Sequence, residues 1–445
     1  MRALVLSAVD TTNEVMGGLL AAVEKALWRK HSEVKKIDLT QTRLAFCQGE
    51  FDCWVRTPGR CKAQDAEVEI VQAIHDADTV VSVGPVCFGG YGYTLKRAFD
   101  RAICLIEPFF VRRLELTHHE GRYARYAKLF SVGWIPKPSA GVEHTFRELN
   151  DANAINLMAP ACGSLVLSGP PCSTWDDSLQ EMLLRAKKPG ERISSKVELR
   201  AQLLAAAEGE DSRSEPVKSA SILIGSAKPE GSSASEVLAR GVSRRLEAHG
   251  LAPRVHFAKE FVHDNEGARA SAKAIEGTEL FVLVTPLYVD SLPALVTHGL
   301  EMISRARAGD GQKSFAMIVN CGFPEPEHIR TALRIGRHFA DESGYGWLGG
   351  LPLGGGGVID PKRSLEEQGG PVTHVSRALE LATPALASGH SVPREAIELM
   401  AKPGIPDAVY RFLGDVGWRW QAYVNHVPQR ELRARPLDLS KEPGS

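Results

Sequence analysis

The 445-residue sequence lacks several features that mark common classes of protein. No uninterrupted run approaches the roughly 20 apolar residues of a membrane-spanning helix. There is no excess of charge either, since 53 basic residues are balanced by 54 acidic ones, which argues against recruitment by nucleic acid or an anionic membrane. Walker, nucleophile-elbow and GxGxxG motifs are also missing, so no independent dinucleotide-binding domain is expected.

The N-terminus, MRALVLSAVD, has one early arginine and an apolar run of strand length. This run is too short for the hydrophobic region of a signal peptide. We therefore expect a cytoplasmic protein, in which the eight cysteines are reduced thiols or metal ligands rather than disulfides.

Apolar, β-rich runs alternate with amphipathic helical stretches, which predicts an α/β fold with parallel sheets covered by helices on both faces. A chain of this length exceeds the roughly 250 to 300 residues of one core, so two domains are expected. The predicted strands of the first half are Ala3–Leu6, Val34–Leu39, Thr79–Val83, Ala127–Val132 and Ser164–Leu167. Those of the second half are Ser221–Ile224, Arg254–Ala258, Leu280–Val284, Phe315–Val319 and Trp347–Leu351. Five strands in each half fit two tandem flavodoxin-like doubly wound sheets.

The two halves look like copies of one module. Leu4 to Ser7 aligns with Ile222 to Gly225 at an offset of 218, and Pro85 aligns with Pro286 at an offset of 201. The first copy would therefore contain 17 extra residues, which correspond to a cysteine-bearing segment. The predicted organisation is a first domain over 1–204, a polar linker over 205–220, a second domain over 221–389 and a C-terminal helical tail over 390–445. For that tail we expect packing on its own domain or on a partner subunit rather than on a membrane, because it lacks a dense basic face.

The stretch ILIGSAKPEGSSAS, from Ile222 to Ser235, has the pattern of a phosphate-binding loop. An apolar strand leads into a small, glycine-containing, hydroxyl-rich loop that opens a helix. Backbone N–H groups and the positive end of the helix dipole can then face an anion, and serine hydroxyls and Lys228 can add further contacts. A mononucleotide is the expected ligand.

At these loops the chain resembles the flavodoxin-like NADPH-dependent FMN reductases and multimeric flavodoxins. The family's phosphate loop, GSPRxxGNS, corresponds to the loop at Gly225, with Ala227 in place of the proline, and a second and a third family loop flank the flavin ring. The resemblance implies an FMN site made of Ser226, Lys228, Gly231, Ser232 and Ser233 at the phosphate, of Pro286, Leu287, Tyr288 and Ser291 beside the ring, and of Asn320, Cys321 and Gly322 in the third loop.

The first copy departs from the family at the phosphate loop. At the offset of 218, Asp10 aligns with Lys228 and Glu14 aligns with Ser232. Carboxylates there would repel a phosphate by roughly 1 kcal/mol per charge pair in water, and by more at lower dielectric. We therefore expect the first domain to bind FMN poorly, although its ring loop, Pro85 to Tyr93, matches the family more closely than the second copy does. A shifted alignment with Ser7, Thr11, Thr12 and Asn13 as donors would restore a first-domain site.

The segment FCQGEFDCWVRTPGRC places Cys47, Cys53 and Cys61 in a frame that resembles the iron–sulfur flavoproteins. Closely spaced thiolates can wrap a cluster. However, Glu50 stands where the family has its second cysteine, and a carboxylate is a harder ligand. We therefore expect a loop of buried thiols rather than an iron–sulfur cluster. No zinc site is expected at His118 and His119, which lack a spaced third ligand.

The resemblance implies an FMN-dependent NAD(P)H oxidoreductase that passes electrons to a small acceptor such as a quinone. Two alternatives remain open: a flavodoxin or iron–sulfur flavoprotein type of electron carrier for a protein partner, and a non-catalytic flavin-binding scaffold. The family is commonly dimeric, so the two copies could form a pseudo-dimer within the chain, and a homodimer could form in addition. Candidate wall residues from the first domain are Trp54, Phe88, Tyr91 and Tyr93, whose other interpretation is as ordinary core or surface aromatics.

Overall fold

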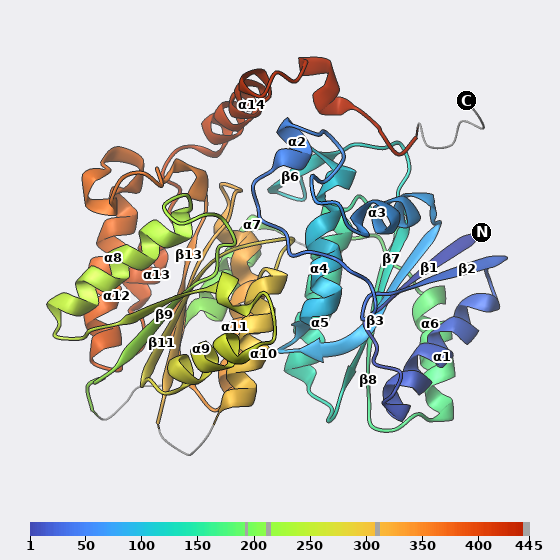
Figure 1. Ribbon diagram of the computed structural model, residues 1–445, viewed down its shortest axis with the longest axis horizontal. Coiled ribbons are helices and arrows are strands. Elements are labelled where there is room, and N and C mark those ends of the chain that lie inside the picture. The colour runs from blue at the N-terminus through green and yellow to red at the C-terminus, as the bar shows by residue number, and fades with distance from the viewer. Residues whose placement is uncertain (192–194, 211–214, 308–311, 439–445) are drawn as a thin grey trace. The chain divides into compact units, whose positions relative to one another are not determined.

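The computed structural model describes residues 1–191, 195–210, 215–307 and 312–438, and it divides the chain into two units (Figure 1). The first unit comprises Met1–Ser194 and Phe412–Ser445, and the second comprises Ser195–Arg411. Each unit is an α/β layer structure, as predicted.

The first unit contains a sheet with the strand order β2-β1-β3-β7-β8, and the short strand β4 pairs with β3. Its strands are β1 (Arg2–Ser7), β2 (Glu33–Asp38), β3 (Thr79–Cys87), β4 (Gly90–Tyr91), β7 (Lys128–Ile135) and β8 (Cys162–Ser168). Its helices are α1 (Glu14–Trp28), α2 (Asp52–Val55), α3 (Glu67–Asp76), α4 (Tyr93–Arg101), α5 (Ala140–Asn156) and α6 (Ser173–Leu184), with a 3-10 turn at Ala102–Leu105. All five predicted strands are confirmed, and their parallel pairing in this order is the flavodoxin-like topology.

The second unit repeats this order as β10-β9-β11-β12-β13. Its strands are β9 (Ala220–Ile224), β10 (Arg254–Phe257), β11 (Leu280–Pro286), β12 (Ser314–Asn320) and β13 (Gly346–Leu353). Its helices are α7 (Lys196–Ala207), α8 (Ala234–Ala248), α9 (Glu266–Glu276), α10 (Ala294–Ala306), α11 (Arg330–Ser343), α12 (Thr373–Ala387) and α13 (Arg394–Met400), with 3-10 turns at Ala258–Phe261, Pro326–Ile329, Gly356–Val358, Leu365–Glu367 and Gly370–Val372. The predicted second sheet is therefore confirmed as well.

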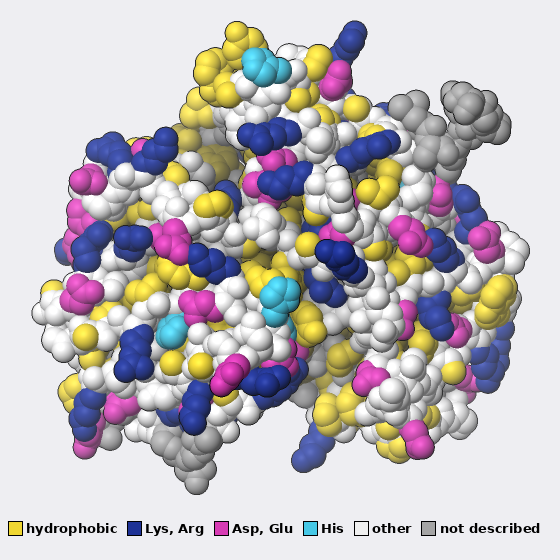
Figure 2. Space-filling model, viewed as in Figure 1, with side chains coloured by type: hydrophobic (Ala, Val, Ile, Leu, Met, Phe, Trp, Pro, Cys, Tyr) yellow, Lys and Arg dark blue, Asp and Glu magenta, His cyan; other side chains and the backbone are white. Residues whose placement is uncertain are grey.

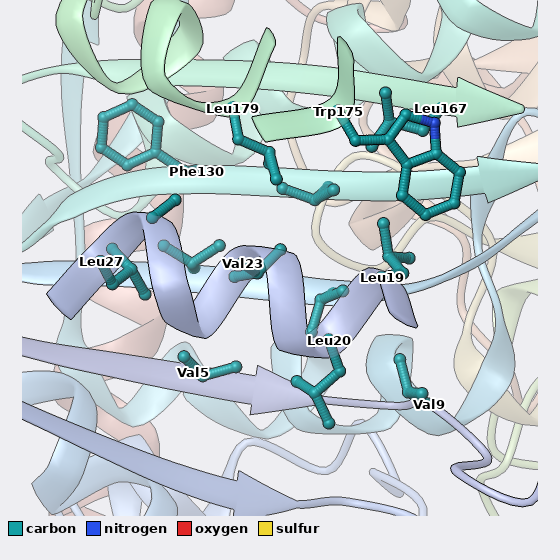
Figure 3. Close-up of a cluster of buried hydrophobic side chains, with 14 of the residues drawn as sticks. Val5, Val9, Leu19, Leu20, Val23, Leu27, Phe130, Leu167, Trp175 and Leu179 are labelled. Atoms are coloured by element: carbon teal, nitrogen blue, oxygen red, sulfur yellow. The ribbon is translucent and has the colours of Figure 1, made fainter. Parts of the chain in front are cut away.

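Helix α1 illustrates how the sequence pattern produces the layers. Its apolar residues recur at intervals of three and four, so they lie on one face of the helix and are buried. Figure 3 shows the resulting cluster, which includes Val5 and Val9, Leu19, Leu20, Val23 and Leu27 of α1, Phe130 and Leu167 of the sheet, and Trp175 and Leu179 of α6. This packing joins α1 and α6 on one face of the first sheet.

The predicted linker is displaced in the structure. Residues 196–207 form helix α7, which belongs to the second unit and packs on α11, so the first unit ends about ten residues before the predicted boundary at 204. Glu208 then forms a β-bridge with Gly349 of β13. The rest of the predicted linker includes 211–214, which lie outside the described residues.

The predicted tail over 390–445 is not one element. Helix α13 remains in the second unit, where it packs on α12, whereas the chain from Phe412 onward belongs to the first unit. Helix α14 (Asp407–Val424) is followed by a 3-10 turn at Gln429–Arg433. We call residues 412–438 the C-terminal arm. Sequence alone did not indicate this return, because the apolar spacing of α14 does not specify which surface the helix meets.

The arm packs on two insertions of the first unit. One is the cysteine segment, where the Trp418 ring lies 5.3 Å from both Phe51 and Trp54. The other is an unpredicted antiparallel hairpin formed by β5 (Ile106–Arg113) and β6 (Leu116–Gly121). Arg433 forms ion pairs of 2.9 Å with Glu107 and with Glu120 of this hairpin.

None of the helices in the described ranges combines the length and apolar character needed to span a bilayer. On the face shown in Figure 2, basic and acidic side chains are interspersed, as the balanced composition implies.

The fully buried Arg122 fastens the arm to the first unit. Its guanidinium donates hydrogen bonds to the carbonyl oxygens of Cys104 (3.0 Å) and Ile106 (3.1 Å) and, in the arm, to those of Leu432 (3.1 Å) and Ala434 (2.7 Å).

We expect Arg122→Met to destabilise the first unit by about 3 kcal/mol or more, because four buried acceptors lose their donor. Chemical unfolding followed by tryptophan fluorescence measures this.

Arg430→Ala is the control, since this exposed arm residue should change the stability by no more than about 0.5 kcal/mol. Equal stability of Arg122→Met and the wild type would show that these hydrogen bonds do not hold the arm.

Candidate flavin site

The first loop of each unit is tied to its sheet by the same hydrogen bond. Ala8 N–H donates to Val83 O at 2.8 Å, and Gly225 N–H donates to Val284 O at 2.7 Å. The strand registers agree, because Leu4 faces Val80 where Ser221 faces Phe281. The structural offset of the first strand is therefore 217, and the predicted offset of 218 is wrong by one residue. The first copy accordingly has 16 extra residues rather than 17.

Packing at this point confirms the equivalence. A Cβ atom on Gly225 would lie 2.5 Å from Thr285 Oγ1, so only glycine fits opposite this threonine. In the first unit the pair is reversed, since a Cβ atom on Gly84 would lie 3.1 Å from the Ala8 Cβ. Each unit thus keeps one small residue where the loop leaves the sheet.

The two loops differ in length. Helix α1 has its N-cap at Asn13, five positions after Ala8, whereas helix α8 has its N-cap at Ser233, eight positions after Gly225. The predicted pairing of Asp10 with Lys228 and of Glu14 with Ser232 is therefore wrong, because the first loop is three residues shorter and an ungapped alignment cannot match them.

The short first loop uses its polar groups internally. The Asn13 side chain accepts from the N–H groups of Val15 and Met16, and Asp10 Oδ1 accepts from both the N–H (3.0 Å) and the hydroxyl (2.7 Å) of Thr12. These hydrogen bonds lower the pKa of the exposed Asp10 carboxyl, so the loop presents a carboxylate. The shifted alignment that would make Thr12 and Asn13 phosphate donors is not favoured by this arrangement.

The second loop, in contrast, brings buried polar groups together. Ser226, Ser233, Ser235 and Asn320 are each at most 8% exposed. Ser235 donates to Asn320 Oδ1 at 2.8 Å, which joins the helix that follows the first loop to the end of β12. We call Ser226, Ser235 and Asn320 the polar cradle. Ser226 and Asn320 were predicted from the sequence, whereas Ser235 was not.

Apolar residues occupy the equivalent positions of the first unit. Val9 corresponds to Ser226 at the offset of 217, and it lies in the core beneath α1 (Figure 3). Val15 corresponds to Ser235, counted from the N-caps, and Trp134 corresponds to Asn320 because the two pair with Pro85 and Pro286. The first unit therefore has the same topology without the polar cradle.

The other predicted phosphate-loop residues lie close by. Lys228 is half-buried, and its N–H donates to Ser226 Oγ at 3.3 Å. Gly231 has a φ of +74°, a left-handed conformation that favours glycine. The Ser232 hydroxyl donates to Pro229 O, and Ser233 caps helix α8 by accepting from Glu236 N–H.

The predicted ring loop is a tight turn in both units. Tyr288 and Ser291 exchange backbone hydrogen bonds of 2.9 and 3.1 Å around Val289 and Asp290, which have φ values of +44° and +60°. Phe88 and Gly89 form the same turn in the first unit, with φ values of +52° and +79°. Positive φ is strained for a β-branched residue such as Val289. Leu287 N–H donates to Asn320 O at 2.8 Å, so the second and third loops are joined at the sheet edge.

The third loop is covered from within the second unit. Gly355 N–H donates to Phe323 O at 2.6 Å, and the Tyr410 hydroxyl donates to Gly322 O at 2.9 Å. A Cβ atom on Gly354 would lie 2.3 Å from Pro324 O. The glycine run 354–357 therefore packs closely against the third loop, where a side chain at Gly354 would clash. Burial raises the pKa of Cys321 to about 12, so its thiol stays protonated near neutrality.

The cysteine segment brings thiols together in the first unit. Burial, with the Asp100 carboxylate, raises the pKa of Cys47 to about 12. Burial also raises the pKa of Cys53, and the nearby Cys47 and Cys61 add to this upward shift. Cys104, which the motif could not reveal, donates to Glu67 Oε1 at 2.9 Å. Within the described ranges, no three His, Cys, Asp or Glu side chains are arranged to hold a metal ion.

Three of the four candidate wall aromatics, Trp54, Phe88 and Tyr91, are buried core residues of the first unit. The Tyr91 ring stacks on Phe99 at 4.9 Å, and its hydroxyl is 3.1 Å from Ser131 Oγ. Trp54 stacks on Phe51 at 5.0 Å and donates to Ile106 O. The interpretation of these aromatics as core residues therefore holds.

The strand order and the three loops at one sheet edge define two flavodoxin-like units. Residues 1–148 match the model of the NADPH-dependent FMN reductase family, so the predicted family resemblance is confirmed for the first unit. No curated protein sequence matches the chain.

Several solved structures are similar at low identity. An NAD(P)H:quinone oxidoreductase from Methanothermobacter marburgensis is 18% identical, with 41% of this chain and 93% of that chain covered and a TM-score of 0.32. An FMN-dependent NADH-azoreductase from Bacillus anthracis, in complex with FMN, is 13% identical, with 40% and 94% covered and a TM-score of 0.29.

Thiol burial predicts the order of alkylation in the native protein. At pH 8 iodoacetamide should modify the exposed Cys172 first, whereas Cys53, Cys104 and Cys321 should react only after unfolding, because their raised pKa values keep the thiols protonated. Peptide mass spectrometry over time measures this. Rapid native labelling of Cys53 or Cys104 would contradict the described packing.

Proposed function

We propose that the protein is an FMN-dependent NAD(P)H oxidoreductase whose FMN binds at the carboxyl edge of the second sheet, and that it passes electrons to a small acceptor such as a quinone. The polar cradle of Ser226, Ser235 and Asn320 carries this proposal. These polar side chains lie together at the edge where ligands of such sheets bind, which favours a polar ligand there. The first unit has apolar residues at the same positions.

The second unit's residues fit FMN. Ser226, Lys228, Ser232, Ser233 and the Gly231 loop would hold the phosphate, with the start of helix α8 behind them. Bound FMN would supply two-electron chemistry between the nicotinamide and the acceptor. The protein's part is to orient the ring between the second and third loops.

Three side chains of the ring loop are partly exposed and could contact the flavin ring. Pro286, Leu287 and Tyr288 are half-buried at the sheet edge. Asn320 ends the neighbouring strand β12, and Cys321 and Gly322 follow it in the third loop. The Leu287–Asn320 hydrogen bond keeps the two loops at a fixed separation, which suits a planar ligand. No side chain is assigned as an acid or a base, since the flavin carries the reaction.

The family match supports the nicotinamide donor and the flavin, although it covers residues 1–148 of the first unit rather than the polar cradle. Both units have the ring turn. The family match lies in the first unit, whereas the polar cradle proposed for the phosphate end of the site lies in the second. An electron carrier for a protein partner and a flavin-binding scaffold are the alternative functions.

An absorbance spectrum of the purified protein, taken before and after anaerobic addition of NADPH or NADH, tests the function. FMN-like bands that bleach support the reductase. Flavin bands that NAD(P)H cannot bleach would favour the carrier or the scaffold, and a protein that takes up no flavin would contradict the proposal. A broad residual band would indicate a cluster at Cys47, Cys53 and Cys61.

The choice of unit is tested separately with Ser226→Ala. This substitution removes a hydroxyl from the proposed phosphate site, so we expect it to weaken FMN binding about tenfold, the equivalent of one hydrogen bond to a charged group. Fluorescence titration measures the dissociation constant.

Ser7→Ala is the control in the first unit, because Ser7 ends β1 two residues before Val9, the counterpart of Ser226. If Ser7→Ala weakened FMN binding and Ser226→Ala did not, the flavin would be bound by the first unit.

A further inference from the structure

Glu236 already occupies part of the phosphate loop in the second unit. Its carboxylate Oε2 accepts the Gly231 N–H at 2.5 Å. Its Oε1 accepts two hydrogen bonds from Arg240, at 2.6 Å from Nη2 and 3.0 Å from Nε. The Glu236 side chain is only 3% exposed, so this carboxylate lies inside the loop rather than in solvent.

The Gly231 amide is one of the donors that a flavin phosphate would use. A phosphate and the Glu236 carboxylate would compete for this amide, and their negative charges would repel at short range. The phosphate therefore has to displace the carboxylate or bind with fewer donors. Riboflavin, which has the same ring and no phosphate, meets no such competition.

The first unit has no counterpart of this carboxylate. Three positions after its N-cap, Asn13, it has Met16, a buried core residue, where the second unit has Glu236 three positions after Ser233. The Ser-x-x-Glu pattern is also that of a capping box, in which the glutamate accepts from the N–H of the N-cap residue. Here Glu236 accepts instead from Gly231, two residues before the N-cap. Capping alone would not distinguish flavins with and without a phosphate.

We propose that Glu236 is a specificity-determining residue that occupies the phosphate site, so that the second unit binds FMN reversibly and with little preference over riboflavin. This inference rests on the proposed function, because it concerns the same site. The FMN phosphate gains the Gly231 amide only when Glu236 withdraws toward Arg240.

The test compares FMN and riboflavin by fluorescence titration of the full chain. The wild type should bind the two with dissociation constants within about tenfold of each other. Glu236→Gln removes the charge and keeps the size, and it should tighten FMN binding about tenfold or more while leaving riboflavin binding unchanged.

The second variant is Glu236→Met, which introduces the side chain that the first unit has at Met16. It should lower the ratio of the FMN to the riboflavin dissociation constant, as Glu236→Gln does. Glu247→Gln, in the last turn of helix α8, is the control and should change neither constant. Circular dichroism checks that each variant folds.

A wild type that prefers FMN by more than a hundredfold, or a ratio that the Glu236 variants leave unchanged, would overturn the inference and leave the flavin function intact. A wild type without flavin binding beside a Glu236→Gln variant that binds FMN would refute the wild-type function and overturn the inference of reversible binding, because Glu236 would then block the site completely. Flavin binding by neither protein would overturn both.

Discussion

The hydrogen bond from Gly225 N–H to Val284 O sets the geometry on which the candidate site depends. It closes the first loop onto the neighbouring strand, and the contact with Thr285 leaves room for no side chain at Gly225. The parallel order of β9, β11 and β12 then brings the three loops to one edge. Equivalent bonds in the first unit show that this closure belongs to the fold and not to the ligand. The loops themselves decide what binds.

The two units share a backbone and differ in the chemistry at that edge. In the first unit, Val9 and Trp134 extend the core to the sheet edge. The shorter first loop forms hydrogen bonds within itself, through the side chains of Asp10 and Asn13. In the second unit, Ser226 and Asn320 keep the edge polar. The family match, which covers residues 1–148, thus falls on the unit that lacks the polar cradle.

The sequence was sufficient to predict all ten strands that pair in parallel in the two main sheets, because buried parallel strands are continuous apolar runs such as Leu280–Val284. It failed at the first loop, because a three-residue gap within a polar loop leaves no trace in an ungapped alignment. It also missed the arm, whose attachment through Arg122 joins positions about 310 residues apart. Ser235 and Glu236 could have been found from the sequence, since they lie within the Ser233-x-x-Glu236 pattern, which is a known signal for a helix start.

Glu236 links helix stability to ligand binding. A helix start that exposes several N–H groups needs acceptors, and it can take them from its own side chains or from an anion. In the first unit Asn13 fills this role and the loop is complete by itself. In the second unit Ser233 fills it, whereas Glu236 accepts the amide of Gly231, two residues before the N-cap. Under the proposed function, the carboxylate that closes the loop before helix α8 would therefore oppose the phosphate, and the affinity for FMN would be set by the difference between these two hydrogen-bonded states.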